Sequence, residues 1–357
     1  NYLKDNSGIG ILDAMMAESY SFEIYPVINA QNLVIADLPT FVSENEEEMQ
    51  KCYSQSAQAV YQEIVWPSLT SIASRTGAKM TCMMTPQFTY TDEEEPDGEN
   101  VTYYLKRLKE EHAEAGLSAD SMEGIPLSEK IKQDQTFWQT YAPSYRFLSL
   151  YADGVKSIGE KSALPAEIRT VALGSGASGQ AVGYLNENVT LQPSTSSGIR
   201  HTFLDDFKVK CMETALGYSN ITLDLYSVTY PEGDEDSWEK MSKKIAANLG
   251  TYWKAYEAFD ATTLTESDVR IRRFLALDYK QQRAGNVITL SLEHREDAAW
   301  FLLRLHGEKV TEVAGGSFEE IEDGVYLILA EEDEVSVEVQ TGETWQYQDG
   351  GKRGDGT

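Results

Sequence analysis

The sequence is poor in the two side chains that most often bind transition metals. It has three cysteines among 357 residues, and their odd number and wide spacing exclude a disulfide framework and a Cys-x-x-Cys metal site. It has four histidines, and no two of them are four residues apart, so a His-x-x-x-His pair is absent. We therefore predict that no divalent metal is held by two histidines and that the chain has no resident cofactor, while a divalent metal with other ligands stays open. The histidines are His112, His201, His294 and His306.

Basic residues and long apolar runs are also scarce. The chain has 30 Lys and Arg against 58 Asp and Glu, which gives a net charge of −28. Such a chain repels the phosphates of nucleic acids and anionic membrane surfaces, so we predict no nucleic-acid partner. No run of 18 apolar residues is present, which excludes a membrane span within this chain. The acidity keeps a protein soluble, and it would also attract a cationic substrate such as a partly deacetylated amino-sugar polymer.

What the sequence does contain is a strand–helix–strand pattern near its start. Residues 32–37 and 79–85 are apolar strands, and residues 57–76 between them have apolar side chains at helical spacing and end before Gly77. A βαβ unit of this kind crosses over right-handed in almost every case. Asp37 closes the first strand, and the ends of such strands are where α/β folds gather catalytic residues.

Strands and helices continue to alternate as far as about Asp278, which indicates an α/β domain, open or barrel-like. Beyond it, short alternating strands with Gly-Gly and Asp-Gly turns indicate a small all-β sandwich. We therefore predict an α/β domain over residues 1–278, a β-sandwich module over residues 279–341 and a flexible tail over residues 342–357. The further elements predicted in the α/β part are strands at 168–173, 199–203 and 220–225 and helices at 101–116, 236–259 and 266–276.

Two motifs in the α/β part resemble those of a known family. The predicted helix has Pro67, Leu69, Ile72 and Gly77 in the order P-x-L-x-x-I before a closing glycine, and residues 141–146 read Tyr-Ala-Pro-Ser-Tyr-Arg. Both resemble motifs of the polysaccharide deacetylase (NodB-homology) domains, whose helix is P-x-L-x-x-L-x-x-x-G and whose Arg-Pro-Pro-Tyr segment is scrambled here. The resemblance covers roughly residues 22–280. The whole chain is similar to large deacetylase-like proteins of bacterial Pel-type exopolysaccharide loci.

The resemblance implies a fold, a ligand and a location. It implies a distorted (β/α) barrel that works on an exported amino-sugar exopolysaccharide, outside the bacterial cell or at its surface, with the exopolysaccharide-assembly proteins of a biofilm as candidate partners. It also implies that Asp37 is the acid of the first strand. That family binds a divalent metal through one Asp and two His of a His-x-x-x-His motif, which this sequence lacks. The chain starts at Asn1 with no leader, so we expect it to be part of a longer bacterial protein.

Acidic, cationic and aromatic residues supply the candidate site. Asp37 and Asp224 both lie at or near ends of predicted strands, where burial and mutual repulsion would separate their pKa values for general acid–base catalysis or for a glycosidase pair. The alternative is that each caps a helix or pairs with an arginine. Arg146 is expected to contact a sugar or an oxyanion. The aromatic residues expected to bind sugar are Tyr145, Tyr141, Trp66 and Tyr230.

Two further patterns have competing interpretations. His201, Asp205 and Asp206 are the residue types of a mixed metal site and form the fallback site, while the two acids alternatively cap the following helix. Residues 174–179 read Gly-Ser-Gly-Ala-Ser-Gly, the spacing of a dinucleotide-binding turn. The next predicted strand, at residues 189–192, begins only ten residues later and leaves no room for a crossover helix. We therefore interpret this motif as a loop at a strand end.

The sequence leaves three functions open. The first is a polysaccharide deacetylase-like hydrolase, a carbohydrate esterase, in which Asp37 is the general base or a retained metal ligand and Asp224 is the partner acid. The second is a non-catalytic polysaccharide-binding or assembly protein that has lost the metal site. The third is a glycoside hydrolase that uses Asp37 and Asp224 as its two carboxylates.

Overall fold

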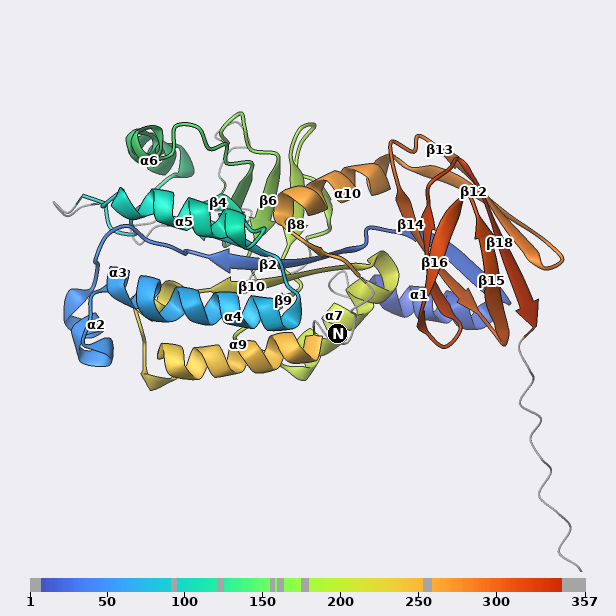
Figure 1. Ribbon diagram of the computed structural model, residues 1–357, viewed down its shortest axis with the longest axis horizontal. Helices are drawn as coiled ribbons and strands as arrows, with labels where there is room; N and C mark the ends of the chain where they lie inside the picture. The colour runs from blue at the N-terminus through green and yellow to red at the C-terminus, as the bar shows by residue number, and fades with distance from the viewer. Residues whose placement is uncertain are drawn as a thin grey trace, which may run out of the picture. The chain divides into compact units, whose positions relative to one another are not determined.

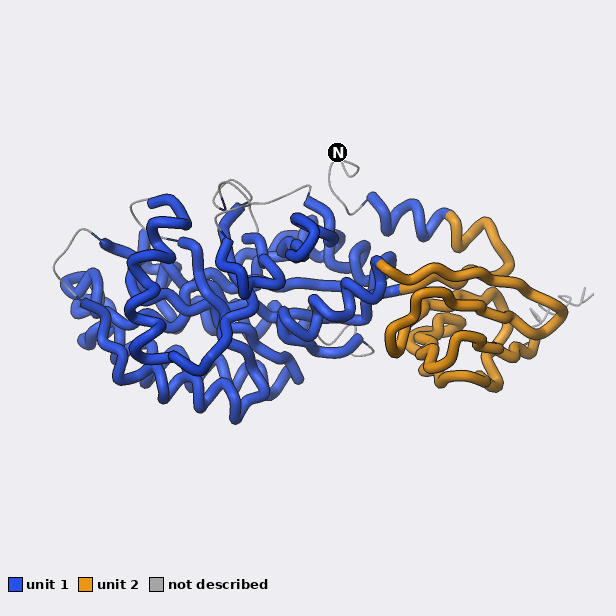
Figure 2. Tube along the Cα trace, turned by 90° about the horizontal axis from the view of Figure 1, so that it is seen from above, with its two compact units in different colours: residues 1–15, 27–275 blue, residues 16–26, 276–357 orange. Residues whose placement is uncertain are grey.

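The computed structural model describes residues 8–90, 95–120, 125–154, 158, 164–174, 180–252 and 259–341. The predicted tail and residues 175–179 of the glycine-rich motif lie outside these ranges. The chain forms two compact units, one of residues 1–15 and 27–275 and one of residues 16–26 and 276–357 (Figure 2). Within the described ranges, no helix is long and apolar enough to cross a membrane.

The first unit is built on one sheet of mainly parallel strands. The strands run in the order β7-β8-β6-β5-β4-β3-β2-β10-β9, and β11 also pairs with β2. Only β7 is antiparallel to its neighbour. Because the order does not return from β9 to β7 in the described part of the chain, the sheet forms an incomplete barrel, and the predicted distorted α/β barrel is confirmed. The strands are β2 (Ala30–Ala36), β3 (Met80–Met84), β4 (Glu114–Ser118), β5 (Ser149–Ala152), β6 (Thr170–Leu173), β7 (Gly183–Tyr184), β8 (Thr190–Pro193), β9 (Ser196–Ser197), β10 (Tyr218–Asp224) and β11 (Ala261–Thr262).

The central strands are buried along their whole length, as expected for parallel strands that are covered on both faces. Every residue of β2, β3 and β5 is buried. In β2, Leu33 and Ile35 join the core beneath the helices, whereas Val34 and Ala36 join a separate cluster with Tyr151 of β5. This alternation follows from the two-residue period of a strand. It gives the sheet one face toward the helices and one face toward the barrel interior.

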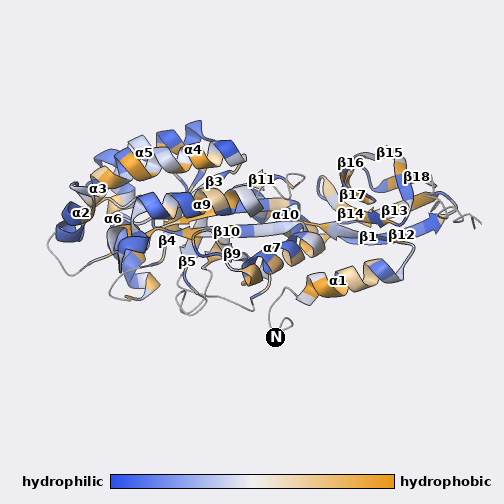
Figure 3. Ribbon diagram, turned by 90° about the horizontal axis from the view of Figure 1, so that it is seen from below, coloured by the Kyte–Doolittle hydropathy of each residue, from blue (hydrophilic) through white to orange (hydrophobic). Residues whose placement is uncertain are grey.

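Helices cover the sheet. The predicted helix at residues 57–76 is present as α3 (Ala57–Val60), a π-helical segment (Tyr61–Val65) and α4 (Trp66–Thr76). It begins where the Ser56 side chain accepts a hydrogen bond from Ala59 N, and it ends at Gly77, whose φ of +71° suits glycine. In Figures 1 and 3, α4 lies beside α5 (Glu99–Glu110) and α9 (Trp238–Tyr252), and all three contribute to one core with β2, β3 and β10. The other helices named here are α1 (Gly8–Ser19), α2 (Glu46–Tyr53), α6 (Leu127–Tyr141), α7 (Phe203–Leu216), α8 (Tyr226–Thr229) and α10 (Leu264–Ala276).

Two predicted elements are wrong. The predicted helix at residues 101–116 ends as α5 at Glu110, and the residues after it form β4. His112 has a φ of +53°, which interrupts the helical conformation. The β4 sequence Glu-Ala-Gly-Leu-Ser has no β-branched or aromatic residue, so composition gives no strand signal. The strand predicted at 199–203 is instead the link from β9 to α7. The helix predicted at 236–259 is present as α9, and its residues 253–258 lie outside the described ranges.

The second unit is a sandwich of two four-stranded sheets, in the orders β1-β14-β17-β16 and β12-β13-β18-β15. Side chains of both sheets, such as Leu290, Phe301 and Val337, form one buried core, so the predicted β-sandwich is confirmed. β12 and β16 have mostly exposed residues without apolar alternation, which explains why they were not predicted. β1 falls within residues 1–278, the range predicted for the α/β domain. The strands are β1 (Phe22–Val27), β12 (Asp278–Ala284), β13 (Val287–Glu293), β14 (Ala299–Leu305), β15 (Glu308–Ala314), β16 (Gly316–Glu322), β17 (Val325–Ala330) and β18 (Glu334–Thr341).

Candidate functional site

The carboxyl ends of four parallel strands place four aspartates at one end of the sheet. Asp37 follows β2, Asp120 follows β4, Asp153 follows β5, and Asp224 is the last residue of β10. Since β10 pairs with β2 and β5 pairs with β4, the acids come in two neighbouring pairs. The backbone N–H of Asp153 donates to Asp120 Oδ1 at 3.4 Å. We call these four residues the acidic mouth. The structure thus brings the predicted residues Asp37 and Asp224 to the same end of the sheet.

Asp37 is the innermost acid of the mouth. It is 1% exposed, and its φ of +58° lies in the left-handed region, which aspartate adopts more readily than most residues. The side chain of Ser118 donates a hydrogen bond to Asp37 Oδ1 at 2.6 Å. Ser118 Oγ in turn accepts the backbone N–H of Asp120 at 3.1 Å. Ser118 therefore connects the turn after β4 to the carboxyl group after β2.

The environment gives the acids different affinities for protons. Burial raises the pKa of Asp37 well above its ordinary value, and the charges of Asp120 and Asp224 raise it further, while the Ser118 hydrogen bond lowers it. Burial and the charges of Asp153 and Asp224 raise the pKa of Asp120 to about 7. Loss of hydration around its carboxyl group raises the pKa of Asp224 too, although the residue is partly exposed at the rim. Acids with separated pKa values in one site are the arrangement that general acid–base chemistry needs.

A buried cation lies behind the mouth. Lys130 on α6 is 1% exposed. Its Nζ donates to Thr85 Oγ1 at 3.0 Å, to Tyr90 OH at 2.6 Å and to Asp134 Oδ2 at 2.9 Å. The Tyr90 hydroxyl donates to the other oxygen of Asp134 at 2.8 Å. The charge of Lys130 opposes the rise in the pKa of Asp37 and of Asp120. Lys130 is therefore electrically part of the site although it belongs to a covering helix.

Aromatic rings flank the mouth beside β10. The backbone N–H of Tyr226 donates to Asp224 Oδ1 at 3.0 Å, and the Tyr226 ring stacks on that of Tyr230 with centroids 4.9 Å apart. Phe88 packs edge-on against both rings. The Tyr230 hydroxyl donates to the buried carboxylate of Glu44 at 3.3 Å. Tyr230, a predicted sugar contact, thus lies close to Asp224 with its hydroxyl held in place by Glu44.

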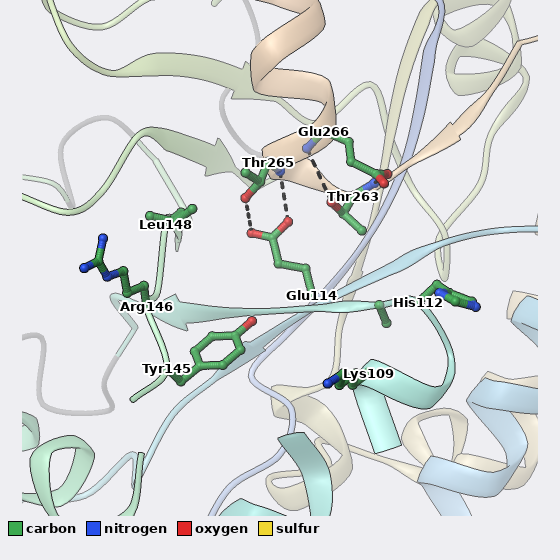
Figure 4. A pocket seen from close by; sticks show the side chains of 10 residues that line it. Lys109, His112, Glu114, Tyr145, Arg146, Leu148, Thr263, Thr265 and Glu266 are labelled. Carbon is green, nitrogen blue, oxygen red and sulfur yellow. Dashed lines mark hydrogen bonds between the residues drawn. The ribbon is translucent and has the colours of Figure 1, made fainter. Parts of the chain in front are cut away.

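Arg146 and Tyr145 lie at the opposite end of the sheet. They precede β5, whereas the acidic mouth follows the strands, and parallel strands put these positions at opposite edges. The Tyr145 hydroxyl is bonded to the backbone of Ala115, accepting from N at 2.9 Å and donating to O at 3.2 Å. Figure 4 shows both side chains beside Glu114 in a pocket of about 470 Å³. The structure therefore does not bring Arg146 and Tyr145 together with Asp37 at the carboxyl ends of the strands.

The remaining predicted aromatic residues do not line the mouth. Trp66 is 4% exposed, and its ring meets Tyr104 edge-on with centroids 5.6 Å apart inside the core beneath the helices. The same helical spacing that buries Leu69 buries Trp66, so its ring is not exposed for the sugar contact expected of it. Tyr141 is 41% exposed at the last residue of α6, where its ring centroid lies 5.2 Å from that of Phe137. Lys130 is near the first turn of the same helix, so Tyr141 is far from the mouth.

The fallback metal residues serve the start of α7. Thr202 and Asp205 form a capping box in which each side chain accepts the other residue's backbone N–H. Asp206 pairs with Lys210 at 2.9 Å. Burial lowers the pKa of His201. Asp205 therefore caps α7, as the alternative interpretation predicts, whereas Asp206 pairs with a lysine one turn further along the helix. Across the described ranges, no group of three or more His, Cys, Asp or Glu side chains is placed to hold a metal ion.

The side chains of the mouth do not fit the metal centre that the resemblance implies. That centre combines one Asp with two His, whereas the mouth presents carboxylates. His112 lines the pocket of Figure 4 at the opposite end of the sheet, and His294 and His306 belong to the second unit. Carboxylate oxygens alone suit hard cations rather than the borderline metals that favour imidazole.

Three residues of the site were not predicted from the sequence: Asp120, Asp153 and Lys130. A signal for the two acids was present, because the dipeptide Ala-Asp closes β2 at residues 36–37 and recurs at residues 119–120 and 152–153. It was hidden because β4 was predicted as part of a helix and β5 has only four residues. Nothing local distinguishes Lys130 from the exposed Lys132 on the same helix, so its burial is a tertiary property.

Comparisons with known sequences give little beyond this. A family model described as "Uncharacterised protein conserved in bacteria (DUF2194)" matches residues 1–123, about a third of the chain. No curated protein matches the chain.

Several solved structures superimpose on the chain. A protein assigned as a polysaccharide deacetylase from Mycobacterium smegmatis is 8% identical, with a TM-score of 0.40 over 68% of this chain and 90% of that one. A protein assigned as a glycoside hydrolase/deacetylase from Parabacteroides distasonis is 9% identical, with a TM-score of 0.41 over 78% and 82%. The Bc1960 peptidoglycan N-acetylglucosamine deacetylase is 12% identical, with a TM-score of 0.30 over 67% and 87%. With TM-scores of 0.41 or lower, these likenesses carry no argument about activity, and the fold rests on the chain's own strand order.

Proposed function

We propose that this chain is a carbohydrate-directed hydrolase on a deacetylase-like barrel, and that it removes acetyl groups from an exported amino-sugar exopolysaccharide. The acidic mouth carries the proposal, since four carboxyl groups converge where α/β enzymes gather catalytic residues. The resemblance of the helix segment from Pro67 to the closing Gly77 to a polysaccharide deacetylase motif supports the choice of reaction, whereas residues 141–146 lie at the opposite end of the sheet. A location outside the cell and exopolysaccharide-assembly proteins as partners are parts of the same proposal, and they rest on that resemblance alone.

Asp120 and Asp224 are the acid and the base of the proposed reaction. Hydrolysis of an acetamide joins a water oxygen to the carbonyl carbon, breaks the carbon–nitrogen bond and releases acetate, while the nitrogen gains a proton and the water loses one. Asp120, with a pKa of about 7, is protonated in a large fraction of molecules near neutral pH and donates to the nitrogen. Asp224, at the rim, takes the proton from water.

Asp37 acts through its neighbours in this scheme. It was predicted as the general base, but a polymer cannot reach a carboxyl group on a residue that is 1% exposed. Its hydrogen bond from Ser118 fixes the turn that carries Asp120. The charges of Asp120 and Asp224 in turn raise the pKa of Asp37.

The charge of the mouth fits a cationic amino-sugar polymer. Asp153 and Asp224 are exposed at the rim, so an ammonium group of a deacetylated sugar would meet two carboxylates there. The stacked rings of Tyr226 and Tyr230 lie beside Asp224 and offer a flat apolar surface to a sugar ring. A partly deacetylated oligomer is therefore the substrate of choice for an assay.

The experiment measures acetate and new reducing ends released from partly deacetylated N-acetylhexosamine oligomers. We expect acetate from the wild-type chain and its loss in Asp120→Asn. The control is Asp206→Asn, which removes the same charge from the surface of α7 and should retain wild-type activity. Reducing ends without acetate would replace the deacetylase by a glycoside hydrolase that uses the same carboxyl groups. Activity lost on chelation and restored by one divalent cation would contradict the acid–base scheme.

A non-catalytic polysaccharide-binding protein is the second candidate. The observation that favours it is the mismatch between the mouth and the Asp–His–His metal centre of the resembling family. Oligomer binding without either product, at an affinity that Asp120→Asn leaves unchanged, would support this candidate and contradict the hydrolase.

A further inference from the structure

Lys130 is a buried charged residue that the acid–base scheme above does not use. Its three ammonium donors are all satisfied, by a hydroxyl of Thr85, the phenol of Tyr90 and the carboxylate of Asp134. Both oxygens of Asp134 are engaged, one by Lys130 and one by Tyr90. The side chain of Lys130 therefore has one orientation, fixed on every donor.

The hydrogen bonds of Lys130 lead directly to the turn that carries Asp37. Thr85 follows β3, and its backbone N–H donates to Pro39 O at 3.3 Å. One residue earlier in the turn, Leu38 N donates to Met83 O at 3.0 Å. The turns after β2 and β3 are thus tied together, and Lys130 holds the β3 side of this contact.

Stability gives no reason to bury a lysine at this place. Removing an ammonium group and a carboxylate from water costs several kcal/mol per ion, and well-packed apolar residues often stabilise a fold as well as a buried ion pair does. The cation does have a partner beyond Asp134, because its field acts on Asp37 and Asp120 in the mouth. A buried charge whose field acts on a cluster of opposite charges is suited to set their protonation.

We infer that Lys130 is a positioning residue of the acidic mouth: together with Tyr90 and Asp134 it fixes the turns after β2 and β3, and it supplies the positive charge that balances Asp37 and Asp120. This inference deepens the proposed function, on which it rests for the use made of the acids. Lys130 on α6 would then set the pH range in which the acidic mouth is protonated.

The other charged groups around these acids set the background for the test. Asp37 faces Asp120 and Asp224 as well as Lys130. Asp120 faces Asp153, Asp224 and Lys130. Asp224 also faces Asp153 and the cation of Arg200. Lys130, paired with Asp134 at 2.9 Å, thus acts on both inner acids, and Arg200 acts on the rim.

The test is a pH titration of aspartate carboxyl carbons by NMR, with the Asp120 signal assigned by its loss in Asp120→Asn. In Lys130→Met we expect the Asp120 midpoint to rise by about one pH unit, because a nearby positive charge is removed. Lys130→Arg retains the charge and should return the midpoint toward the wild-type value. Lys132→Met removes an exposed lysine of the same helix and should leave the midpoint unchanged.

Lys130→Met leaves a buried carboxylate without its cation, so the double variant Lys130→Met/Asp134→Leu removes both charges in case the single variant does not fold. We expect an upward shift in the double variant too, smaller than in Lys130→Met because Asp134→Leu also removes a negative charge. An Asp120 midpoint equal to the wild-type value in a folded Lys130→Met or in the double variant would overturn the inference.

The titration also separates this inference from the proposed function, because it requires no turnover. If the wild-type chain releases acetate, the alkaline limb of its pH–rate profile should move upward in Lys130→Met with the NMR midpoint. If the chain releases no product, the proposed hydrolase fails while the NMR shift still decides the role of Lys130.

Discussion

The carboxyl groups at the two ends of the parallel sheet have different surroundings. At the amino end, Glu114 accepts three hydrogen bonds, from Ser149 Oγ at 2.5 Å, from Thr265 N at 2.9 Å and from Thr265 Oγ1 at 2.6 Å. Glu266, beside it in Figure 4, pairs with Lys79 at 2.9 Å. Glu114 is partly buried and Glu266 is exposed, and each has its own partners, so neither leaves an unpaired charge in the fold.

At the carboxyl end, the acids have one another as neighbours. The charges of Asp120 and Asp224 raise the pKa of Asp37, and those of Asp153 and Asp224 raise the pKa of Asp120. The charge of Asp153 also raises the pKa of Asp224. Each of the three accepts a hydrogen bond, from Ser118 Oγ, Asp153 N and Tyr226 N respectively. Such a cluster does not stabilise the fold, because burial and like charge both oppose ionisation. Proteins tolerate local conflicts of this kind at functional sites. The comparison teaches that two similarly polar ends of one sheet are told apart by whether their acids lie beside one another and raise one another's pKa values.

Neutralising Asp120 is expected to have the largest effect and tests whether the acids at the carboxyl end are catalytic. We expect Asp120→Asn to lower turnover by about 10²–10⁴-fold, the usual contribution of a general acid or base. The thermal midpoint should stay close to wild type, because an amide replaces a carboxyl group that is already half protonated near pH 7. Acetate release and a melting curve at the same pH check both expectations. A variant with a much lower thermal midpoint and unchanged activity per folded molecule would show that Asp120 stabilises the fold and is not catalytic.

The pH dependence of the reaction rate should also depend on Asp120. The reaction needs Asp120 protonated, so the rate of the wild-type chain should fall as the pH rises above about 7. The raised pKa of Asp224 should move the acidic limb above the range of an ordinary aspartate. Rates measured across the pH range at saturating oligomer, with Asp206→Asn as the reference, give the two limbs. A rate that is flat through pH 7 would contradict the assignment of Asp120 as the acid.

Glu213, at the amino end, is a buried acid with a raised pKa, and its substitution should have the next largest effect. Glu213 on α7 is buried and accepts Gln31 Nε2 at 2.9 Å, and burial raises its pKa to about 8. A carboxyl group with a raised folded-state pKa stabilises fully below its unfolded pKa of about 4.5, and this stability is lost as the pH rises toward 8. We expect Glu213→Gln to remove this slope and to be more stable than wild type by a few kcal/mol at about pH 9.

Urea unfolding of wild type and Glu213→Gln at about pH 5 and about pH 9 measures this difference. Glu266→Gln is a suitable control, since its carboxylate is half exposed and paired with Lys79. Equal pH slopes for the wild type and for Glu213→Gln would show that Glu213 ionises normally.

A smaller effect on stability is expected from Glu114→Gln at the amino end. The amide can accept on one side only, so at least one hydrogen bond from Ser149 or Thr265 is lost and a donor is left without a partner. We expect a loss of about 1–3 kcal/mol in the free energy of unfolding with unchanged turnover per folded molecule. Denaturant unfolding together with specific activity tests the pair of expectations. Lost activity in a fully folded variant would connect the two ends of the sheet.

The smallest effect is expected from Arg146→Ala. Arg146 lines the pocket at the amino end, away from the acidic mouth, so turnover should change by less than about twofold and stability by about 0.5 kcal/mol or less. Lys109→Ala in the same pocket is the matched variant. A large loss of turnover in Arg146→Ala alone would mean that the substrate spans both ends of the sheet.

Much of the fold could be predicted from the sequence because a buried face of a strand or helix gives a local period of apolar residues. The apolar run of β2, the helix that ends at Gly77 and the alternating strands of the β-sandwich all have that signature. Elements without it were missed or misassigned. β4 has no β-branched or aromatic residue, and β12 and β16 expose most of their side chains. Because periodicity reflects burial on one face, short or mostly exposed strands have no apolar period by which to predict them.

By itself the sequence determined that Asp37 and Asp224 lie at the ends of strands, because each is local to its own strand. Only the tertiary structure decided which strand ends are neighbours, and so brought Asp120 and Asp153 to the same mouth and sent Arg146 to the other end. It also decided that Lys130 is buried and Lys132 exposed, although both belong to one helix. The physical reason is that a side chain's pKa and partners depend on residues far apart in the chain, and sheet order sets those distances.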